Sequence, residues 1–407
     1  MKKISNIHLS FFPLASPNWI GGEIYQTNLL SAIQSVNKIN RPKISLIVKE
    51  DTPADYGLRL KKFADEIIQI ESRSPSRLQS LLNKLDNRIS KSNLFPDYIN
   101  KYKEAPVSSF LRSRGVDVVF GMFLKAKNFR IPTLSWIPDF QHIHLPEMFS
   151  QKEISDRTFI IQQSCTYATR VIVSSECARQ DLIEMAPYAS PKIIALPFVS
   201  HLPKNVYEPN PKYVCKKFKL PAKFFYLPNQ FWKHKNHYTV IEALRILHKN
   251  RPEISVVCTG PITDYRNPNY FRELLEKRKE YGLLGSFIIL GMVPRDDLFQ
   301  LMRQSMAVLQ PSLFEGWSTT VEESKSLGKK IILSDIPVHR EQNPLGANYF
   351  DASDPDSLAD ILIDIYENTQ PGPDLVLEKA ARKALPVRVK LFANEFISII
   401  KLASDTV

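Results

Sequence analysis

The sequence predicts an α/β protein built from two doubly wound domains. Short apolar, β-rich runs alternate with longer helical patterns along the chain, which is typical of βαβ units and parallel sheets. Nearly continuous apolar runs such as Phe287–Leu290 and Lys330–Leu333 indicate strands buried on both faces. The number of such runs exceeds what a closed (β/α)₈ barrel holds and fits two sheets of about six strands.

The expected strands fall into two groups along the chain. The first group comprises His8–Pro13, Ile44–Val48, Val116–Phe120, Pro132–Ile137, Arg170–Val173 and Ile193–Leu196. The second group comprises Phe224–Leu227, Ile254–Thr259, Phe287–Leu290, Met306–Gln310, Lys330–Leu333 and Asn348–Phe350.

A stretch rich in proline and lysine, Pro197–Pro221, separates the two groups and lacks helical periodicity. We therefore expect a first domain at residues 1–200 and a second at residues 201–385. A last helix is expected over residues 386–407, packed back on the first domain, because its apolar residues share one face. Two such domains place a ligand cleft between the carboxyl ends of both sheets.

The composition is that of an ordinary globular protein, which argues against collagen, coiled coil and disorder: 407 residues, 43% hydrophobic and 24% charged. The net charge of +12 favours an anionic partner such as nucleic acid, anionic lipid or a phosphorylated ligand. Four scattered cysteines without metal spacing indicate reduced thiols. No apolar run approaches the ~20 residues that span a bilayer. We therefore expect a cytoplasmic protein, or one peripheral to the cytoplasmic face of the membrane.

The segment from Pro311 to Asp335 carries the strongest chemical signal. An expected strand ends at Pro311, a turn with Glu315 and Gly316 follows, and hydroxyl residues then suit the N-cap of a helix. Glu323 lies in the first turns of that helix, so both carboxylates can face one ligand at its N-terminus. Free backbone N–H groups and the helix dipole favour a phosphate there. A solvated acidic helix start is the alternative.

This segment resembles the E-x₇-E region of glycosyltransferase family 4, the group 1 glycosyltransferases. The resemblance implies the GT-B fold, in which two Rossmann-like domains face a central cleft. It also implies that Glu315 contacts donor-sugar hydroxyls, that Glu323 binds the ribose, and that backbone amides after the glycine hold the distal phosphate. The last role falls on Gly316, Trp317, Ser318, Thr319 and Thr320. The family more often has a glycine and a small apolar pair in place of WSTT.

Lys235-Asn236 resembles the Lys-Gly/Asn step whose lysine pairs with the donor diphosphate. A cation there stabilises the charge that develops as the glycosidic bond breaks. Gln230 stands where the family usually has an arginine five residues before the lysine. Lys233 and His234 are the candidates for the second cation.

Elements of the first domain complete the resemblance. Gly21-Gly22, before an expected helix at Glu23–Ser35, resembles a glycine-rich loop in which Gly22 faces the donor and Gly21 the acceptor. In the loop after Trp136, His142 resembles the active-site histidine, so His142, Lys235 and Glu315 are the catalytic candidates. Asp139 and His144 are expected on the acceptor side. In the second domain, Met292 lies in a turn that resembles the one beside the nucleotide base.

The resemblance implies a retaining, metal-independent hexosyltransferase that moves a sugar from a nucleotide-diphosphate sugar to a glycan or lipid-linked acceptor. Surface polysaccharide or glycolipid assembly would be its role, without a cofactor. Asp354-Pro355-Asp356 is the only Asp-x-Asp sequence in the chain, and its proline favours a turn and helix cap over a metal site. No P-loop or dinucleotide fingerprint is present, which argues against NTP hydrolysis and dinucleotide redox chemistry.

Two other functions remain open from the sequence. One is a GT-B enzyme that modifies a nucleotide sugar without an acceptor, such as a 2-epimerase. The other is a non-catalytic protein that binds lipid or nucleic acid, although no nucleic-acid motif is found. Residues 59–114 hold 12 basic and 6 acidic side chains. Their expected helix near Leu78–Ile89 fits an anionic membrane, and equally a core-facing helix with a basic edge.

Overall fold

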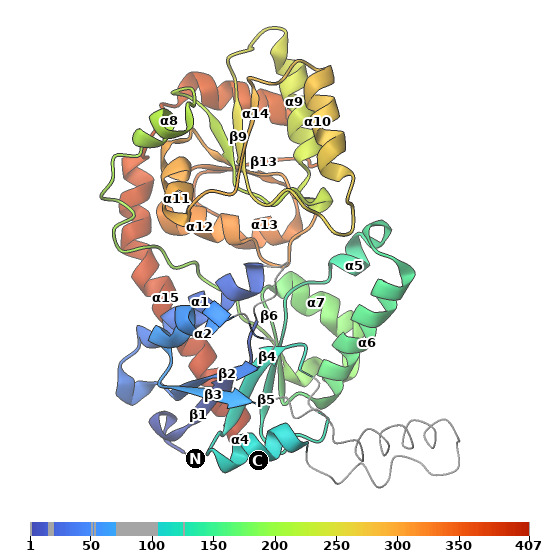
Figure 1. Ribbon diagram of the computed structural model, residues 1–407, viewed down its shortest axis with the longest axis vertical. Helices are drawn as coiled ribbons and strands as arrows, with labels where there is room; N and C mark the ends of the chain where they lie inside the picture. Colours follow the sequence, from blue (N-terminus) through green and yellow to red (C-terminus); the bar gives the residue numbers. More distant parts are fainter. Residues whose placement is uncertain are drawn as a thin grey trace.

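The computed structural model describes residues 2–14, 20–49, 52, 54–70, 105–124 and 127–406. These residues form two parallel β-sheets, each with helices on both faces (Figure 1). The predicted pair of doubly wound domains is therefore confirmed. The basic helix expected near Leu78–Ile89 lies outside the described residues.

The first sheet has seven strands in the order β3-β2-β1-β4-β5-β6-β7. One of them, β3, was not predicted. It lies at the edge of the sheet and buries only its central residue, Ile68, so its apolar signal is weak. The strands are β1 (His8–Phe11), β2 (Lys43–Lys49), β3 (Glu66–Ile70), β4 (Val118–Met122), β5 (Thr133–Ile137), β6 (Arg170–Val173) and β7 (Ile193–Ala195).

The second sheet has six strands in the order β10-β9-β8-β11-β12-β13, and all six were expected from the sequence. In both sheets the order reverses at the centre, which leaves a crevice at the carboxyl ends of the strands. The strands are β8 (Phe225–Leu227), β9 (Val256–Thr259), β10 (Phe287–Gly291), β11 (Val308–Gln310), β12 (Ile331–Ser334) and β13 (Ala347–Phe350).

Helices connect successive strands in both domains. Those of the first are α1 (Ile20–Gln34), α2 (Ala54–Leu60), α4 (Pro106–Ser113), α5 (Gln141–His144), α6 (Gln151–Tyr167) and α7 (Glu176–Met185). The rest are α8 (Tyr213–Phe218), α9 (His237–His248), α10 (Tyr270–Glu280), α11 (Arg295–Gln304), α12 (Thr319–Leu327), α13 (Pro337–Gln342), α14 (Pro355–Asn368) and α15 (Leu375–Ser404).

Strand β4 shows why both faces of the first sheet are covered. Successive side chains of a strand point to opposite faces. Val118 and Phe120 belong to the core under α1 and α15, whereas Val119 packs in a separate core with Leu111 of α4. An apolar run of this kind is stable only when helices bury both of its faces.

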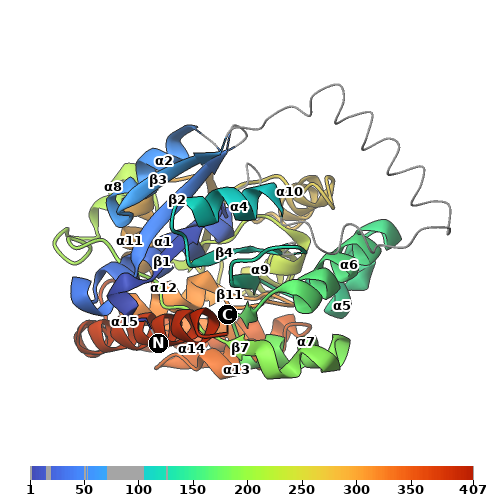
Figure 2. The same ribbon diagram turned by 90° about the horizontal axis from the view of Figure 1, so that it is seen from below.

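The last helix, α15, begins at Leu375 rather than at the predicted residue 386. The Asp374 side chain caps it by accepting a hydrogen bond from the Leu377 N–H at 3.0 Å. Pro386 lies inside the helix and was mistaken for its first residue, the position where proline is commonest. The helix runs from the second domain to the first, where it packs beside α1 (Figures 1 and 2). There the Phe396 ring lies 5.6 Å from that of Phe120.

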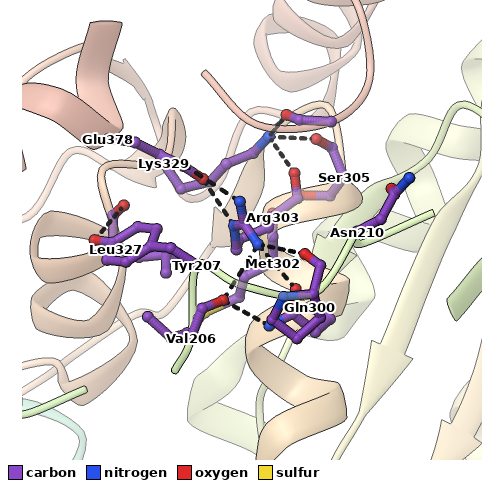
Figure 3. A network of polar contacts seen from close by, with 12 residues as sticks. Val206, Tyr207, Asn210, Gln300, Met302, Arg303, Ser305, Leu327, Lys329 and Glu378 are labelled. Carbon is purple, nitrogen blue, oxygen red and sulfur yellow. Dashed lines mark hydrogen bonds and ion pairs between the residues drawn. The ribbon is translucent and has the colours of Figure 1, made fainter. Parts of the chain in front are cut away.

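Two buried basic side chains hold together the segments that pass between the domains (Figure 3). Arg303 pairs with Glu378 of α15 at 2.8 Å and donates to the carbonyl oxygens of Val206 and Pro209 in the interdomain linker. The Lys329 amino group, whose pKa burial lowers to about 7, donates to the carbonyl oxygens of Arg303, Ser305 and Gly372. The linker and the return helix are thus anchored at one place in the second domain.

We expect Glu378→Gln to lower the free energy of unfolding by about 3–5 kcal/mol, because it leaves the buried Arg303 charge without a counter-ion. Chemical denaturation measures this. Lys379→Ala, on the exposed face of the same helix, is the control and should change stability by less than about 0.5 kcal/mol. Equal effects of the two substitutions would contradict this account of the anchor.

Candidate active site

A cavity of about 510 Å³ lies between the two domains and is lined by residues of both. Its wall is made by loops at the carboxyl ends of the strands, where open α/β sheets bind their ligands. Most of the predicted site residues lie in this wall. They are Gly21, Asp139, Gln230, Lys235, Met292, Glu315, Gly316, Trp317, Ser318, Thr319, Thr320 and Glu323.

Glu315 and Lys235 form an ion pair in the cavity wall. The Glu315 Oε1 atom accepts hydrogen bonds from Lys235 Nζ at 2.6 Å and from the Gln310 and Ser312 side chains at 2.7 Å each. Burial alone would raise the pKa of Glu315, but the Lys235 charge and these hydrogen bonds outweigh burial and lower it. The carboxylate is therefore ionised at neutral pH.

The backbone after Lys235 explains why asparagine follows the lysine. Asn236 has φ +55°, in the left-handed region that glycine and asparagine tolerate best. Its amide donates to the carbonyl oxygens of Pro311 and Ala352 at 3.1 and 2.9 Å. Helix α9 then begins at His237, as predicted. Asn236 thus ties the lysine turn to the strand end that carries Glu315.

Helix α12 presents its N-terminus to the same cavity. Ser318 caps the helix by accepting from the Val321 N–H, and Thr319 and Thr320 form its first turn, as predicted from the sequence. The free N–H groups of a helix start and its dipole attract an anion. Lys235 and the α12 N-terminus therefore form the positively polarised side of the cavity.

Arg295 supplies a second cation, which the sequence reasoning missed. It begins α11, lines the cavity and pairs with Glu323 at 2.7 Å. Burial raises the pKa of Glu323 above its usual value, even though Arg295 acts in the opposite direction. The sequence signal was the turn Gly291–Val293, which ends two residues before Arg295.

Neither expected replacement for the arginine missing at Gln230 brings a positive charge to the cavity wall that the described residues form. Lys233 is exposed and does not belong to the wall that the described residues form. His234 lines the cavity, but burial and then the charge of Lys235 lower its pKa well below the usual range. A neutral imidazole supplies no positive charge at pH 7.

The predicted histidines do not reach the cavity wall that the described residues form. His142 is buried, and neither ring nitrogen has a hydrogen-bond partner among these residues. His144 pairs with Asp181 at 2.9 Å and stacks on Phe314 of the second domain. Helix α5 instead brings Gln141 to the wall, and nothing in the sequence distinguished it from its neighbours.

The glycine pair of the first domain also differs from expectation. Gly21 and Gly22 lie in the first turn of α1, which begins at Ile20, rather than in a loop before a helix at Glu23. Gly21 lines the cavity, whereas Gly22 is absent from the wall as described. A glycine pair before helical periodicity does not fix the first residue of the helix.

The two domains touch across the cleft. A Cβ atom on Gly316 would lie 2.2 Å from the Pro138 carbonyl oxygen, so only glycine permits this approach. Trp317 of the second domain donates from Nε1 to the Phe198 carbonyl oxygen at 3.0 Å. The Glu341 carboxylate accepts from the backbone N–H groups of Glu176 and Cys177 at the start of α7. The structure is therefore a closed arrangement of the two domains.

A metal site is not apparent in the part of the chain described, where no group of three or more His, Cys, Asp and Glu residues gathers. Asp354 caps α14 by accepting from the N–H groups of Asp356 and Ser357, as expected for the Asp-Pro-Asp sequence. That the reaction needs no metal or cofactor stays a prediction. Among the described helices, none is both long and apolar enough to cross a membrane.

The comparisons with known proteins agree with this architecture. Residues 216–384 match the family described as glycosyl transferases group 1. Among solved structures, a glycosyltransferase from Rickettsia africae is 16% identical with a TM-score of 0.65, covering 98% of this chain and 99% of that one. HepE from Anabaena in complex with UDP-glucose is 15% identical with a TM-score of 0.64, covering 98% of both chains.

The chain has the GT-B fold. Sucrose-phosphate synthase from Thermosynechococcus elongatus shares it at 14% identity and a TM-score of 0.63, covering 97% of this chain and 96% of that one. At such identities the likeness shows the fold alone. The group 1 match lies within the second GT-B domain and includes Lys235, Arg295, Glu315 and Glu323.

We expect Gly316→Ala to hold the two domains apart, because the new methyl group would collide with the Pro138 carbonyl oxygen. Small-angle X-ray scattering should then show a larger radius of gyration than for the parent protein. Gly285→Ala is the matched control, since a Cβ there meets nothing within 4 Å. An unchanged radius in Gly316→Ala would mean that the close approach does not limit domain closure.

Proposed function

We propose that the protein is a retaining glycosyltransferase of family 4 that transfers a hexosyl group from a nucleotide-diphosphate sugar to an acceptor hydroxyl. The observation that carries the proposal is the Lys235–Glu315 pair beside the N-terminus of α12, in a cavity that both domains line. The group 1 match to the second domain and the UDP-glucose named with HepE support a UDP-sugar donor.

The chemistry of the cavity suits a nucleotide sugar. Lys235, Arg295 and the α12 N–H groups form a positive surface for the diphosphate, and they stabilise the charge that gathers there as the glycosidic bond breaks. Glu315 and Glu323 accept hydrogen bonds from neutral hydroxyls, Glu315 from the sugar and Glu323 from the ribose. Each cation now pairs with one of these carboxylates and would turn to the diphosphate when the donor binds.

Retention is what the resemblance to family 4 implies. It requires the incoming hydroxyl to attack on the face of the sugar from which the diphosphate leaves, with a diphosphate oxygen accepting the proton of that hydroxyl. Lys235 stabilises the charge that develops on the departing diphosphate. We further propose a role in surface polysaccharide or glycolipid assembly, at the cytoplasmic face of the membrane and without a metal or cofactor.

Lys235→Met should lower kcat/KM by about 10²–10³-fold, the scale seen when one charge-stabilising group is removed from an active site. Initial rates of nucleoside diphosphate release measure this. Lys233→Met removes the same charge two residues away, at an exposed position, and should keep nearly full activity. Equal losses in the two variants would argue that Lys235 acts only through the general charge of this turn.

Donor affinity should fall as the pH is lowered through the raised pKa of Glu323. The carboxylate accepts the ribose hydroxyls only when it is ionised, and burial makes it protonate at a higher pH than an ordinary glutamate. Calorimetric titration of UDP between about pH 7.5 and 5 follows this change. Glu323→Gln should bind UDP more weakly at pH 7.5 and lose this part of the pH dependence. Unchanged donor affinity and turnover in Glu323→Ala would refute the assignment.

The product distinguishes the proposed reaction from other chemistry on this fold. With donor and acceptor, proton NMR should show a new glycosidic bond of the same anomeric configuration as the donor. Incubation of the donor alone should yield at most slow hydrolysis. Appearance of a 2-epimer of the donor sugar would establish a nucleotide-sugar-modifying enzyme instead.

A further inference from the structure

The two halves of the cavity differ in chemistry. The half made by the second domain carries Lys235, Arg295 and the two glutamates. The half made by the first domain is largely apolar and aromatic, and in the part of it that the structure describes Asp139 is the single charged side chain. In the proposed function the acceptor occupies the first-domain half, so the side chains of that half limit which acceptors fit.

An aromatic cluster forms the floor of the first-domain half. The Tyr25 and Trp136 rings are stacked at 3.9 Å with an interplanar angle of 3°. Phe198 meets Tyr25 edge-on at 5.5 Å. Trp317 reaches the cluster from the second domain and is fixed by its hydrogen bond to the Phe198 carbonyl oxygen. The first-domain rings are almost fully buried, and together with Trp317 they line the cavity as its aromatic part.

Two buried polar groups of this half have no hydrogen-bond partner among the described residues, the Tyr25 hydroxyl and the Gln141 amide nitrogen, and Gln141 lies beside Asp139. Gln141 lines the cavity and is 5% exposed. Its Oε1 accepts from Arg266 of the second domain at 3.2 Å, which leaves Nε2 as a donor. That Nε2 atom has no partner among the described residues. A buried donor without an acceptor costs stability, and such groups in a ligand cavity are satisfied when the ligand binds.

Asp139, two residues before Gln141, adds a hydrogen-bond acceptor beside the Gln141 Nε2 donor. Its Oδ1 accepts from the Gln141 N–H at 3.1 Å, so the two side chains are held on one turn. Arg157 lies 3.5 Å from the carboxylate but is not among the residues that line the described wall. A carboxylate acceptor beside an amide donor matches a hydroxylated ligand, since each hydroxyl group both donates and accepts.

A phosphorylated acceptor fits this half poorly. A phosphate would lose its hydration against the Tyr25–Trp136 surface and would lie near the Asp139 carboxylate. Two cations that contact residues of this half already have partners there: Arg157 pairs with Asp139, and Arg266, 3% exposed, contacts Gln141 and Asp264. An uncharged ligand avoids both the loss of phosphate hydration and the repulsion from the Asp139 carboxylate.

We propose that the acceptor is an uncharged polyhydroxyl compound, such as a sugar or a glycoside, recognised through hydroxyl groups by Asp139 and Gln141, with its apolar face on the aromatic cluster. Sugar phosphates are excluded as acceptors. The proposal rests on the proposed function, because it assigns the acceptor of that reaction, and it makes Gln141 a specificity-determining residue.

The first test compares matched acceptors with one donor. Glucose, mannose and galactose, their 6-phosphates and their octyl glycosides are supplied with the donor that binds. We expect kcat/KM for an uncharged member to exceed that of its phosphate by at least about tenfold. Preference for a phosphorylated member, or transfer to none of the uncharged compounds while the donor is bound and hydrolysed, overturns the proposal. Absence of donor binding and hydrolysis would instead refute the proposed function.

The second test separates acceptor recognition from a structural role of Gln141. Gln141→Glu keeps an oxygen that accepts from Arg266 and removes the Nε2 donor. We expect it to raise the KM of the acceptor about tenfold, the effect of one lost hydrogen bond, and to leave the Kd of the donor nucleotide unchanged. Gln151→Glu makes the same change at an exposed position and is the control. An unchanged acceptor KM in Gln141→Glu would show that Gln141 only supports Arg266.

Discussion

The pairing of each buried acid in the cleft with a cation is the constraint on which the site depends. Glu315 and Glu323 are placed by one turn and one helix, and Lys235 and Arg295 act against the rise in their pKa values that burial favours. The partners come from other loops, so the pairs fix the relative positions of the lysine turn, α11 and α12. In the proposed function, the diphosphate of the donor pairs with Lys235 and Arg295, and its hydroxyl groups donate to Glu315 and Glu323. Both ion pairs can then open without leaving a charged group unsatisfied.

The two pairs are not equivalent. Lys235 and neighbouring hydrogen bonds lower the pKa of Glu315, whereas burial raises the pKa of Glu323 despite Arg295. Glu315 is thus fixed in the charged form, and Glu323 is more sensitive to its partner. In the proposed function, the ionised Glu315 contacts the reacting sugar and the more readily protonated Glu323 contacts the nucleotide. This difference in environment separates two glutamates that look alike in the sequence.

The sequence predicted the features that depend on local pattern. The strand–turn–helix order placed Glu315 before the cap of α12, and Lys235-Asn236 identified the turn before α9 through its resemblance to the Lys-Gly/Asn step. Features that depend on contacts between distant segments were missed. Arg295 lines the cavity and pairs there with Glu323, which lies 28 residues further along the chain. The position of α5 against the cleft decides that Gln141, and not His142, lines the cavity. Pro386 misled because α15 continues through it as one helix from Leu375 to Ser404.

The contacts between domains connect these parts into one mechanism. Gly316 and Trp317 follow Glu315 directly and touch the first domain, and Phe314, directly before Glu315, stacks on His144 of that domain. Movement of the first domain would therefore change the contacts of the loop that carries Glu315 and leads into the N-terminus of α12. The anchor at Arg303 holds the linker and α15 together in the second domain. The contacts between the domains, the Glu315 loop and the aromatic cluster are thus parts of one arrangement.

Calorimetric titration of the protein with UDP, GDP, ADP and dTDP tests the central claim most directly. We predict that one nucleoside diphosphate binds with a stoichiometry of one to one, and that its affinity drops at least about tenfold in Lys235→Met and in Arg295→Leu. Full affinity in both variants, or failure of all four nucleotides to bind the parent protein, would contradict the assignment of this cavity as a donor site.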